Sequence, residues 1–336
     1  MKNLLAFTIL AALSICSVQA DTITLNASGA TFPAPIYGRW FADYSAAHSD
    51  VRINYQGNGS GAGIKAFTGG LTDFGASDAA MTDEEMAKVT TGGVVLLPMT
   101  AGSIVLSYNL PGVTAAVQLP RDVYPAIFLG EITKWNDPKI VAANPGVTMP
   151  DLPITVAYRA DGSGTTFNFT SHLAAISPEF KTKVGSGKTV KFPVGVGGKG
   201  NDGVAALIKQ TAGTIGYVEY GYAQQTKLPM ATLQNSAGKF IAPSPDSGSA
   251  ALAQVDLPAN LRAFVTDPTG DASYPIVTFT WWLCHTTYTK PGVADAIKAL
   301  ATWCLTDGQK LAPDLGYLPL PASVVAKVQA AVSTIK

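Results

Sequence analysis

The feature that most constrains the fold is a repeated junction in which a β-prone segment passes through glycine, serine or threonine into a helix-prone segment. Four such junctions occur, at 29–33, 57–61, 74–78 and 159–165. Strands that alternate with helices in this way are typical of α/β proteins with a largely parallel sheet. Open α/β sheets bind ligands in the crevice at the carboxyl ends of their strands. The sequence therefore predicts an α/β fold with a ligand crevice lined by these four loops.

Hydrophobic periodicity predicts the individual elements. Strands are expected at 23–25, 52–55, 71–75, 94–98, 103–108, 154–159, 213–220 and 276–283. Helices are expected at 32–47, 64–67, 121–129, 132–135, 167–176, 204–209, 293–302 and 322–332, and another is signalled by the residues at 82–85. Residues 228–275 are rich in proline, glycine and serine, and we expect long loops and exposed helices there.

The loop at 159–166 has the composition of an anion-binding helix start. Asp161 or Ser163 can cap the helix that follows. The positive end of the helix dipole favours an anion there, and Arg159 adds a planar fork of donors that fits a tetrahedral oxyanion. The backbone N–H groups left without intrahelical partners are expected to be those of Gly164, Thr165 and Thr166. The alternative for this run taken alone is a capped surface helix.

The three junctions nearer the N-terminus repeat parts of this design. Thr31 and Phe32 offer free N–H groups because Pro33 suits the first turn of a helix. Ser60 supplies a hydroxyl donor and is expected to cap its helix. Asp78 differs, since a carboxylate repels an anion unless that anion carries a proton to donate. Phosphate keeps such a proton near neutral pH and sulfate does not. Asp78 can therefore accept a hydrogen bond from phosphate and repel sulfate. The alternative for Asp78 is a helix cap that points away from the crevice.

Three other patterns are interpreted as coincidental. Residues 185–189 resemble the end of a nucleotide P-loop, but the first glycine of that motif is missing. Residues 195–200 match the dinucleotide fingerprint, but Pro193 disturbs the segment before them. Neither Ser60 nor Ser163 fits the Gly-x-Ser-x-Gly motif of a hydrolase nucleophile, because Asn58 and Asp161 stand where its first glycine belongs. We expect His172, which lies one turn into its helix, to be solvated.

Residues 1–20 have the pattern of a cleavable secretory signal peptide. An apolar run follows Lys2, and small residues precede the expected cleavage site after Ala20. Lipid anchoring through Cys16 is not expected, because Ile15 fits a lipoprotein signal poorly. The rest of the 336-residue chain exceeds what a single hydrophobic core usually serves, which predicts two lobes. Without Lys2 it carries 22 basic and 23 acidic residues, and this near balance argues against a nucleic-acid partner.

Two cysteines, Cys284 and Cys304, follow the expected signal peptide. An exported chain with an even number of cysteines predicts a disulfide between them. The alternative is two buried free thiols. His285 adds one further potential ligand, which is too little for a metal site, so we expect no metal and no cofactor.

Six sequence blocks, in this order along the chain, resemble the family of Pst-type periplasmic phosphate-binding proteins. They are Gly-Ala-Thr-Phe-Pro-Ala-Pro (29–35), Asn-Tyr-Gln-Gly-x-Gly-Ser (54–60), Asp-Phe-Gly-Ala-Ser-Asp (73–78), Arg-Ala-Asp-Gly-Ser-Gly-Thr (159–165), Gly-Gly-Lys-Gly-Asn-Asp-Gly (197–203) and Gly-Tyr-Val-Glu-Tyr (216–220). The resemblance implies a type II periplasmic binding protein fold, with two α/β lobes, a hinge and an interlobe cleft. It also implies that the ligand is inorganic phosphate, delivered to the membrane permease of an ABC importer.

The same resemblance implies a site, a domain division and a location. The phosphate contacts would be Thr31, Phe32, Ser60, Asp78, Arg159, Asp161, Ser163, Gly164 and Thr165. One lobe would comprise 21–107 with 276–336, and the other 108–275. We expect a monomer in the periplasm that is not an enzyme. An exported phosphatase, or another enzyme acting on phosphate esters, would need a nucleophile with a base or a metal cluster. A scaffolding or adhesion protein on the same fold would bind no small anion.

Overall fold

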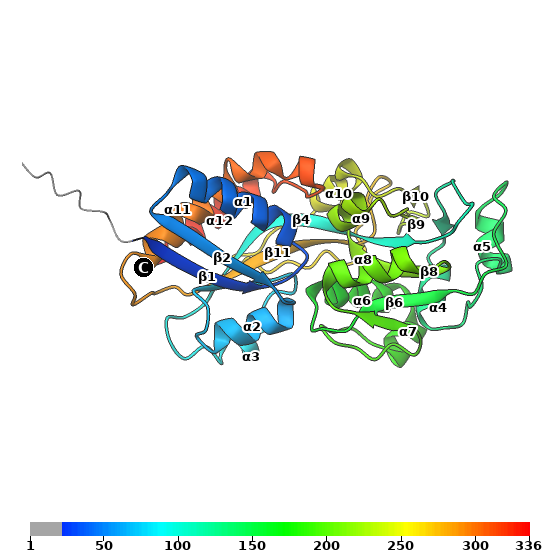
Figure 1. Cartoon of the computed structure of the whole chain (residues 1–336), viewed down its shortest axis with the longest axis horizontal. Helices are drawn as coiled ribbons and strands as arrows, with labels where there is room; N and C mark the ends of the chain where they lie inside the picture. The colour runs from blue at the N-terminus through cyan, green and yellow to red at the C-terminus, as the bar shows by residue number, and fades with distance from the viewer. Residues whose placement is uncertain (1–21) are drawn as a thin grey trace, which may run out of the picture.

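The computed structural model describes residues 22–336. The expected signal peptide, its cleavage site and Cys16 therefore lie outside the described residues. Figure 1 shows an elongated α/β molecule with two lobes, through which long strands run near the middle. Among residues 22–336 there is no helix with both the length and the apolar character that crossing a membrane requires.

One mixed sheet extends through both lobes. Its strands, in spatial order, are β2 (Val51–Gly57), β1 (Ile23–Gly29), β3 (Phe74–Ser77), β11 (Val277–Cys284), β4 (Val95–Tyr108), β8 (Thr214–Glu219), β6 (Thr155–Arg159) and β7 (Val196–Gly198). We call the part around β1, β2, β3 and β11 the first lobe, and the part around β6, β7 and β8 the second lobe. Pairing is parallel toward both ends of the sheet and antiparallel around β11 and β4 in its middle.

Helices cover both faces of this sheet (Figure 1). Those packed in the first lobe are α1 (Ala34–Ala47), α2 (Ser60–Thr68), α3 (Asp83–Met86), α11 (Val293–Leu305) and α12 (Ala322–Val332). The others are α4 (Val123–Phe128), α5 (Pro138–Ala143), α6 (Gly164–Ile176), α7 (Pro178–Lys183), α8 (Gly200–Gln210), α9 (Tyr220–Thr226) and α10 (Pro245–Leu252). Two short 3₁₀ helices span Gly308–Leu311 and Pro313–Leu315. A second, small sheet consists of β10 (Phe240–Ile241), β9 (Thr232–Gln234) and β5 (Gln118–Leu119), in that spatial order.

The expectation of two separate strands at 94–98 and 103–108 is wrong, because β4 is continuous from Val95 to Tyr108. Through Ser103 it pairs with β11, and from Ile104 onward it pairs with β8. The small residues Thr100, Ala101 and Gly102 stay paired with β11, although the register shifts by one residue at Met99. A Cβ at Gly102 would lie 2.8 Å from the ring of Phe32, so this glycine makes room for a core side chain within a strand.

The helix expected at 132–135 is absent, and α5 begins a few residues later instead. Asp137 caps α5 by accepting from the N–H of Lys139. Trp135 is buried, and its indole N–H donates to the carbonyl of Gly213 at 2.9 Å. The apolar spacing of this stretch therefore reflects burial of a turn, not a helical face.

The predicted disulfide between Cys284 and Cys304 is wrong, because both residues are buried free thiols. Cys284 ends β11 and lies beside the hydroxyl of Tyr288. Cys304 lies in the last turn of α11, in the aromatic core near Tyr37. Burial raises the pKa of both thiols, that of Cys284 to about 12, which keeps them protonated and unreactive. An even number of cysteines in an exported chain says nothing about whether the fold brings them together.

Candidate anion-binding site

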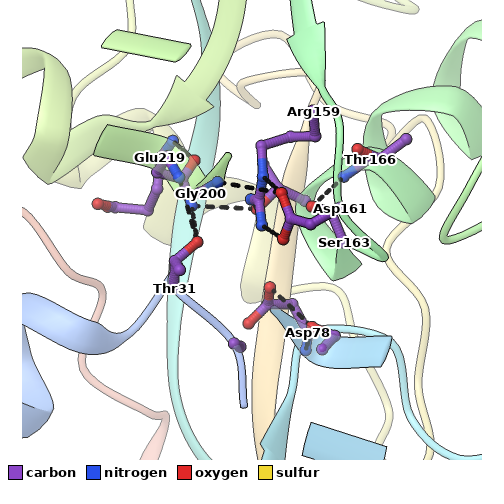
Figure 2. Close-up of polar contacts among 12 residues, drawn as sticks. Thr31, Asp78, Arg159, Asp161, Ser163, Thr166, Gly200 and Glu219 are labelled. Atoms are coloured by element: carbon purple, nitrogen blue, oxygen red, sulfur yellow. Dashed lines mark hydrogen bonds and ion pairs between the residues drawn. The ribbon is translucent and has the colours of Figure 1, made fainter. Parts of the chain in front are cut away.

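The loops at the four strand-to-helix junctions meet between the two lobes. Figure 2 shows Thr31 and Asp78 of the first lobe facing Arg159, Asp161 and Ser163 of the second. Except for Asp161, which is half-buried, the site residues expected from the sequence are all buried: they are Thr31, Phe32, Ser60, Asp78, Arg159, Ser163, Gly164 and Thr165. The structure therefore brings the whole expected set together at one interlobe position.

The cationic group of this site is held by two partners from its own loop. The guanidinium of Arg159 donates from Nε to Oδ1 of Asp161 at 2.8 Å, and from Nη2 to the other carboxylate oxygen. Its Nη1 lies 3.3 Å from Oγ1 of Thr165. Burial raises the pKa of Asp161, but the hydrogen bonds and charge of Arg159 outweigh it and hold this pKa below its ordinary value. Asp161 therefore stays ionised and orients the guanidinium.

The start of α6 supplies backbone donors. Ser163, not Asp161, is the N-cap, and its Oγ accepts from the N–H of Thr166 at 3.0 Å. The cap thus binds one of the three N–H groups that were expected to lack an intrahelical partner. The N–H groups of Gly164 and Thr165 remain for an external acceptor. A Cβ on Gly164 would lie 2.6 Å from Oγ of Ser60, so only glycine lets this helix start approach the first lobe so closely.

Phe32 contributes to the site through its backbone alone. Its ring is fully buried against Gly102, and its carbonyl accepts from the hydroxyl of Tyr317 at 2.6 Å. The side chain therefore points into the core of the protein, and the N–H group is the part of Phe32 that remains suited to an anion.

Asp78 is buried among hydroxyl groups of its own lobe. Thr280 of β11 donates to Oδ1 at 2.9 Å, and Oγ of Ser60 lies 3.4 Å from Oδ2. Burial raises the pKa of Asp78 to about 7, against the opposing effects of the Thr280 hydrogen bond and the Arg159 charge. The helix after Asp78 is capped by Thr82, so the interpretation of Asp78 as a helix cap is wrong.

The expectation that Ser60 caps α2 is also wrong. Gly59 is the N-cap, Ser60 is the first helical residue, and the cap makes no side-chain hydrogen bond. The hydroxyl of Ser60 accepts instead from the N–H of Asp78 at 3.2 Å. Ser60 and Asp78 therefore form one unit that faces the second lobe.

The lobes touch directly around the site. The N–H of Gly61 donates to the carbonyl of Gly162 at 2.8 Å, and the hydroxyl of Tyr222 donates to the carbonyl of Thr31 at 2.6 Å. At the rim, Nζ of Lys188 lies 2.5 Å from Oε1 of Glu85. These contacts close the interlobe crevice over its polar groups.

Asn201 and Thr280 are among the residues of this cluster that sequence reasoning missed. Asn201, at the start of α8, donates to hydroxyl groups of both lobes. Its signal was present, because it lies in the block 197–203 that carries the resemblance. Thr280 is fully buried in β11, a strand that is apolar except for Thr278 and Thr280, and a polar side chain in such a strand was the available signal.

The expectation of a solvated His172 is wrong, because this histidine is buried in the second lobe. Its Nε2 lies 2.7 Å from the hydroxyl of Tyr124, and its Nδ1 lies 4.0 Å from Oδ1 of Asp267. Burial lowers the pKa of His172 to about 4. Its contribution to stability is therefore present above about pH 6.5 and is lost as the pH falls toward 4.

Asp78 is expected to act on stability in the opposite direction. Its folded-state pKa of about 7 exceeds the ordinary 3.8, so its favourable contribution is complete below about pH 4 and is lost as the pH rises through 7. One pKa unit corresponds to about 1.4 kcal/mol. Between about pH 4 and pH 7 the free energy of unfolding of the wild type should therefore fall by about 4 kcal/mol relative to that of Asp78→Asn. Urea unfolding of both proteins across this pH range, without added anions, measures the difference. A difference that does not change with pH would show that the carboxyl titrates normally.

Comparisons with known proteins place the chain in a family. A family model described as a PBP superfamily domain matches residues 17–307. The phosphate-binding protein PstS of Pasteurella multocida is 41% identical over 332 residues, which is 98% of this chain and 95% of that protein. PstS of Xylella fastidiosa strain Temecula1 is 41% identical over 321 residues, covering 93% of this chain and 85% of that one.

The fold is also similar to that of a solved phosphate-binding protein. The solved structure of a high affinity periplasmic phosphate-binding protein, bound with phosphate, superposes with a TM-score of 0.74 at 22% identity, over 92% of this chain and 93% of that chain. At that identity the likeness concerns the two-lobed fold alone. The family model and the two relatives, which match along nearly the full length, show that this chain belongs to the PstS family of phosphate-binding proteins within the PBP superfamily.

Proposed function

We propose that this protein binds inorganic phosphate in the periplasm and delivers it to the membrane permease of an ABC-type importer. Its relatives are named as phosphate-binding proteins, which is a role without catalysis. The observation that carries the proposal is the composition of the buried interlobe cluster. Its N–H, hydroxyl and guanidinium donors come from both lobes, and of the two carboxylates among the predicted contacts Asp161 is paired with Arg159 while Asp78 is not paired with a cation.

Each site residue has a proposed part in holding phosphate. Arg159 supplies the positive charge, and Asp161 orients it. The backbone N–H groups proposed as donors are those of Phe32, Gly164 and Thr165. The hydroxyl groups proposed as donors are those of Thr31, Ser60, Ser163 and Thr165. A buried oxyanion needs such donors to replace its lost hydration. Asp78 accepts the proton that phosphate carries and repels sulfate, which carries none.

The lobes are proposed to be discontinuous in sequence, with 21–107 and 276–336 in one and 108–275 in the other. Support comes from β4, whose pairing passes from β11 to β8 between Ser103 and Ile104, and from β11, which returns to the first lobe. Contacts from both lobes to one ligand stabilise the closed form by differential binding. We further propose a monomer, released by cleavage after Ala20 and without a lipid on Cys16.

Calorimetry with phosphate, followed by sulfate as competitor, tests the proposed function. Phosphate should bind with one-to-one stoichiometry, and sulfate in millimolar excess should fail to displace it. No turnover of p-nitrophenyl phosphate is expected. Turnover would support the phosphatase alternative, and the absence of any heat with phosphate would support a scaffolding role.

The ion pair between Lys188 and Glu85 is expected to slow phosphate release. The carbonyl of Lys188 accepts from the N–H of Ser163 at 2.8 Å, so this residue joins the anion loop of the second lobe to α3 of the first. Both side chains of the pair are mostly buried, at 23% and 21% exposure. Lys188→Met should therefore speed release by about fivefold, the scale of one weak ion pair, and leave association unchanged.

Stopped-flow dissociation of phosphate measures this effect. The matched control is Lys183→Met, because Lys183 pairs with Glu131 and Glu179 within the second lobe and is half exposed. This control should leave the release rate as it is. Equal rates in the wild type and Lys188→Met would mean that the ion pair does not stabilise the closed form.

A further inference from the structure

Asn201 lies between the two lobes, in the first turn of α8, and is fully buried. Its Nδ2 lies 3.0 Å from Oγ1 of Thr31 in the first lobe and 3.3 Å from Oγ1 of Thr165 in the second. Its backbone N–H also donates to Oγ1 of Thr31, at 3.2 Å. A single residue therefore contacts one hydroxyl from each side of the site.

The orientation of this amide follows from a third contact. The oxygen Oδ1 of Asn201 accepts from the backbone N–H of Glu219 at 3.0 Å. A backbone N–H can only donate, so the atom that faces it must be the amide oxygen. The NH₂ group of Asn201 consequently faces Thr31 and Thr165, with one hydrogen available for each hydroxyl.

This arrangement decides what the two hydroxyl groups can do. A threonine hydroxyl has one proton to donate and can accept two hydrogen bonds. Oγ1 of Thr31 accepts two, from the backbone and the side chain of Asn201. Oγ1 of Thr165 also accepts two, from Nδ2 of Asn201 and Nη1 of Arg159. Each hydroxyl is then left with its proton alone, and can meet a ligand only as a donor.

We propose that Asn201 is a positioning residue that fixes the hydroxyl groups of Thr31 and Thr165 as donors to the bound oxyanion. The proposal rests on the proposed function, and it identifies a determinant of selectivity outside the predicted contact set. With both hydroxyls fixed, Asp78 is left to accept a proton from the ligand. The site then fits an oxyanion with one proton and disfavours one with two.

A double-mutant cycle between Asn201 and Thr31 tests the proposal. In the wild type, Thr31→Val should weaken phosphate binding by about tenfold, because one hydrogen bond to a charged ligand is lost. In Asn201→Asp the carboxylate accepts from the hydroxyl of Thr31 and draws its proton away from the ligand. Thr31→Val should then weaken binding by less than about twofold in that background.

A matched control separates this role from a general effect on packing. Asn168 is a second buried asparagine at the site, but its Nδ2 donates to the carbonyls of Asp78 and Gly164 and not to a hydroxyl. In Asn168→Asp the effect of Thr31→Val should remain about tenfold. Asn201→Leu, which is neutral and of similar size, replaces Asn201→Asp if the carboxylate prevents folding. There the hydroxyl of Thr31 accepts only from the backbone N–H of residue 201 and is free to turn its proton away from the ligand, so Thr31→Val should cost less than in the wild type.

Calorimetry on the full mature chain at pH 8 gives all the affinities required. Additive effects of the Asn201 and Thr31 substitutions, in whichever Asn201 variant folds, would overturn the role of Asn201 and leave the proposed function intact. Wild-type protein that does not bind phosphate would refute the proposed function, and the role of Asn201 with it. Non-additive effects at Asn201, with additive effects at Asn168, are the expected result.

Discussion

Replacing Arg159 by alanine is expected to weaken phosphate binding by about 2–4 kcal/mol, or roughly 30- to 800-fold. The side chain of Arg159 is 1% exposed, and it carries the one full positive charge among the proposed contacts. Its removal also leaves the carboxylate of Asp161 unpaired beside the anion. Arg159→Lys should recover only part of the loss, because a point charge cannot reproduce two parallel hydrogen bonds. Phosphate calorimetry on the three proteins measures the series.

The chain offers a matched control for this experiment. Arg121 forms a similar pair with Asp267, with two hydrogen bonds of 2.6 and 2.7 Å, but it contacts none of the residues proposed to bind phosphate. Arg121→Ala should lower stability without lowering phosphate affinity. An unchanged affinity in Arg159→Ala would place Arg159 outside the phosphate site. An equal loss in both variants would point to a general disturbance of the second lobe.

Asp78→Asn is expected to change selectivity more than affinity. Thr280 donates to Oδ1 of Asp78, so the amide oxygen of asparagine takes that position and the NH₂ group faces the ligand. The site then donates where it formerly accepted, and sulfate loses its source of repulsion. We expect phosphate affinity to stay within about tenfold, and sulfate affinity to rise by at least about 100-fold.

Competition titrations with phosphate and sulfate measure the selectivity ratio. Ser60→Ala serves as the comparison, since it removes a donor that both anions can use and should weaken their binding alike. If Asp78→Asn excludes sulfate as strongly as the wild type does, discrimination between the two anions lies elsewhere in the site.

The sequence predicted the loops of the site because their function depends on local features. A helix start with small residues exposes N–H groups whatever the rest of the chain does. Arg159 and Asp161 are two residues apart on one strand end, so their pairing is local as well. The boundaries of α12, at Ala322 and Val332, follow from its apolar periodicity alone.

Contacts between distant segments could not be predicted in the same way. Asn201 is 170 residues from Thr31, and Thr280 is 202 residues from Asp78. Their roles depend on which elements the sheet order places side by side. The same reason explains the error over Cys284 and Cys304, because two buried positions in one lobe are no guarantee of contact.

The continuous strand β4 has a consequence for how the molecule denatures. Its first part pairs with β11 in the first lobe, and its last five residues, from Ile104 to Tyr108, pair with β8 in the second. Neither lobe can lose its sheet without disturbing a strand that the other lobe needs. Chemical denaturation should therefore proceed as one cooperative transition, with the same midpoint whether it is followed by the tryptophans of the first lobe or by Trp135 in the second. Phosphate is proposed to bind between the lobes. It should therefore raise that shared midpoint without dividing the transition into two steps.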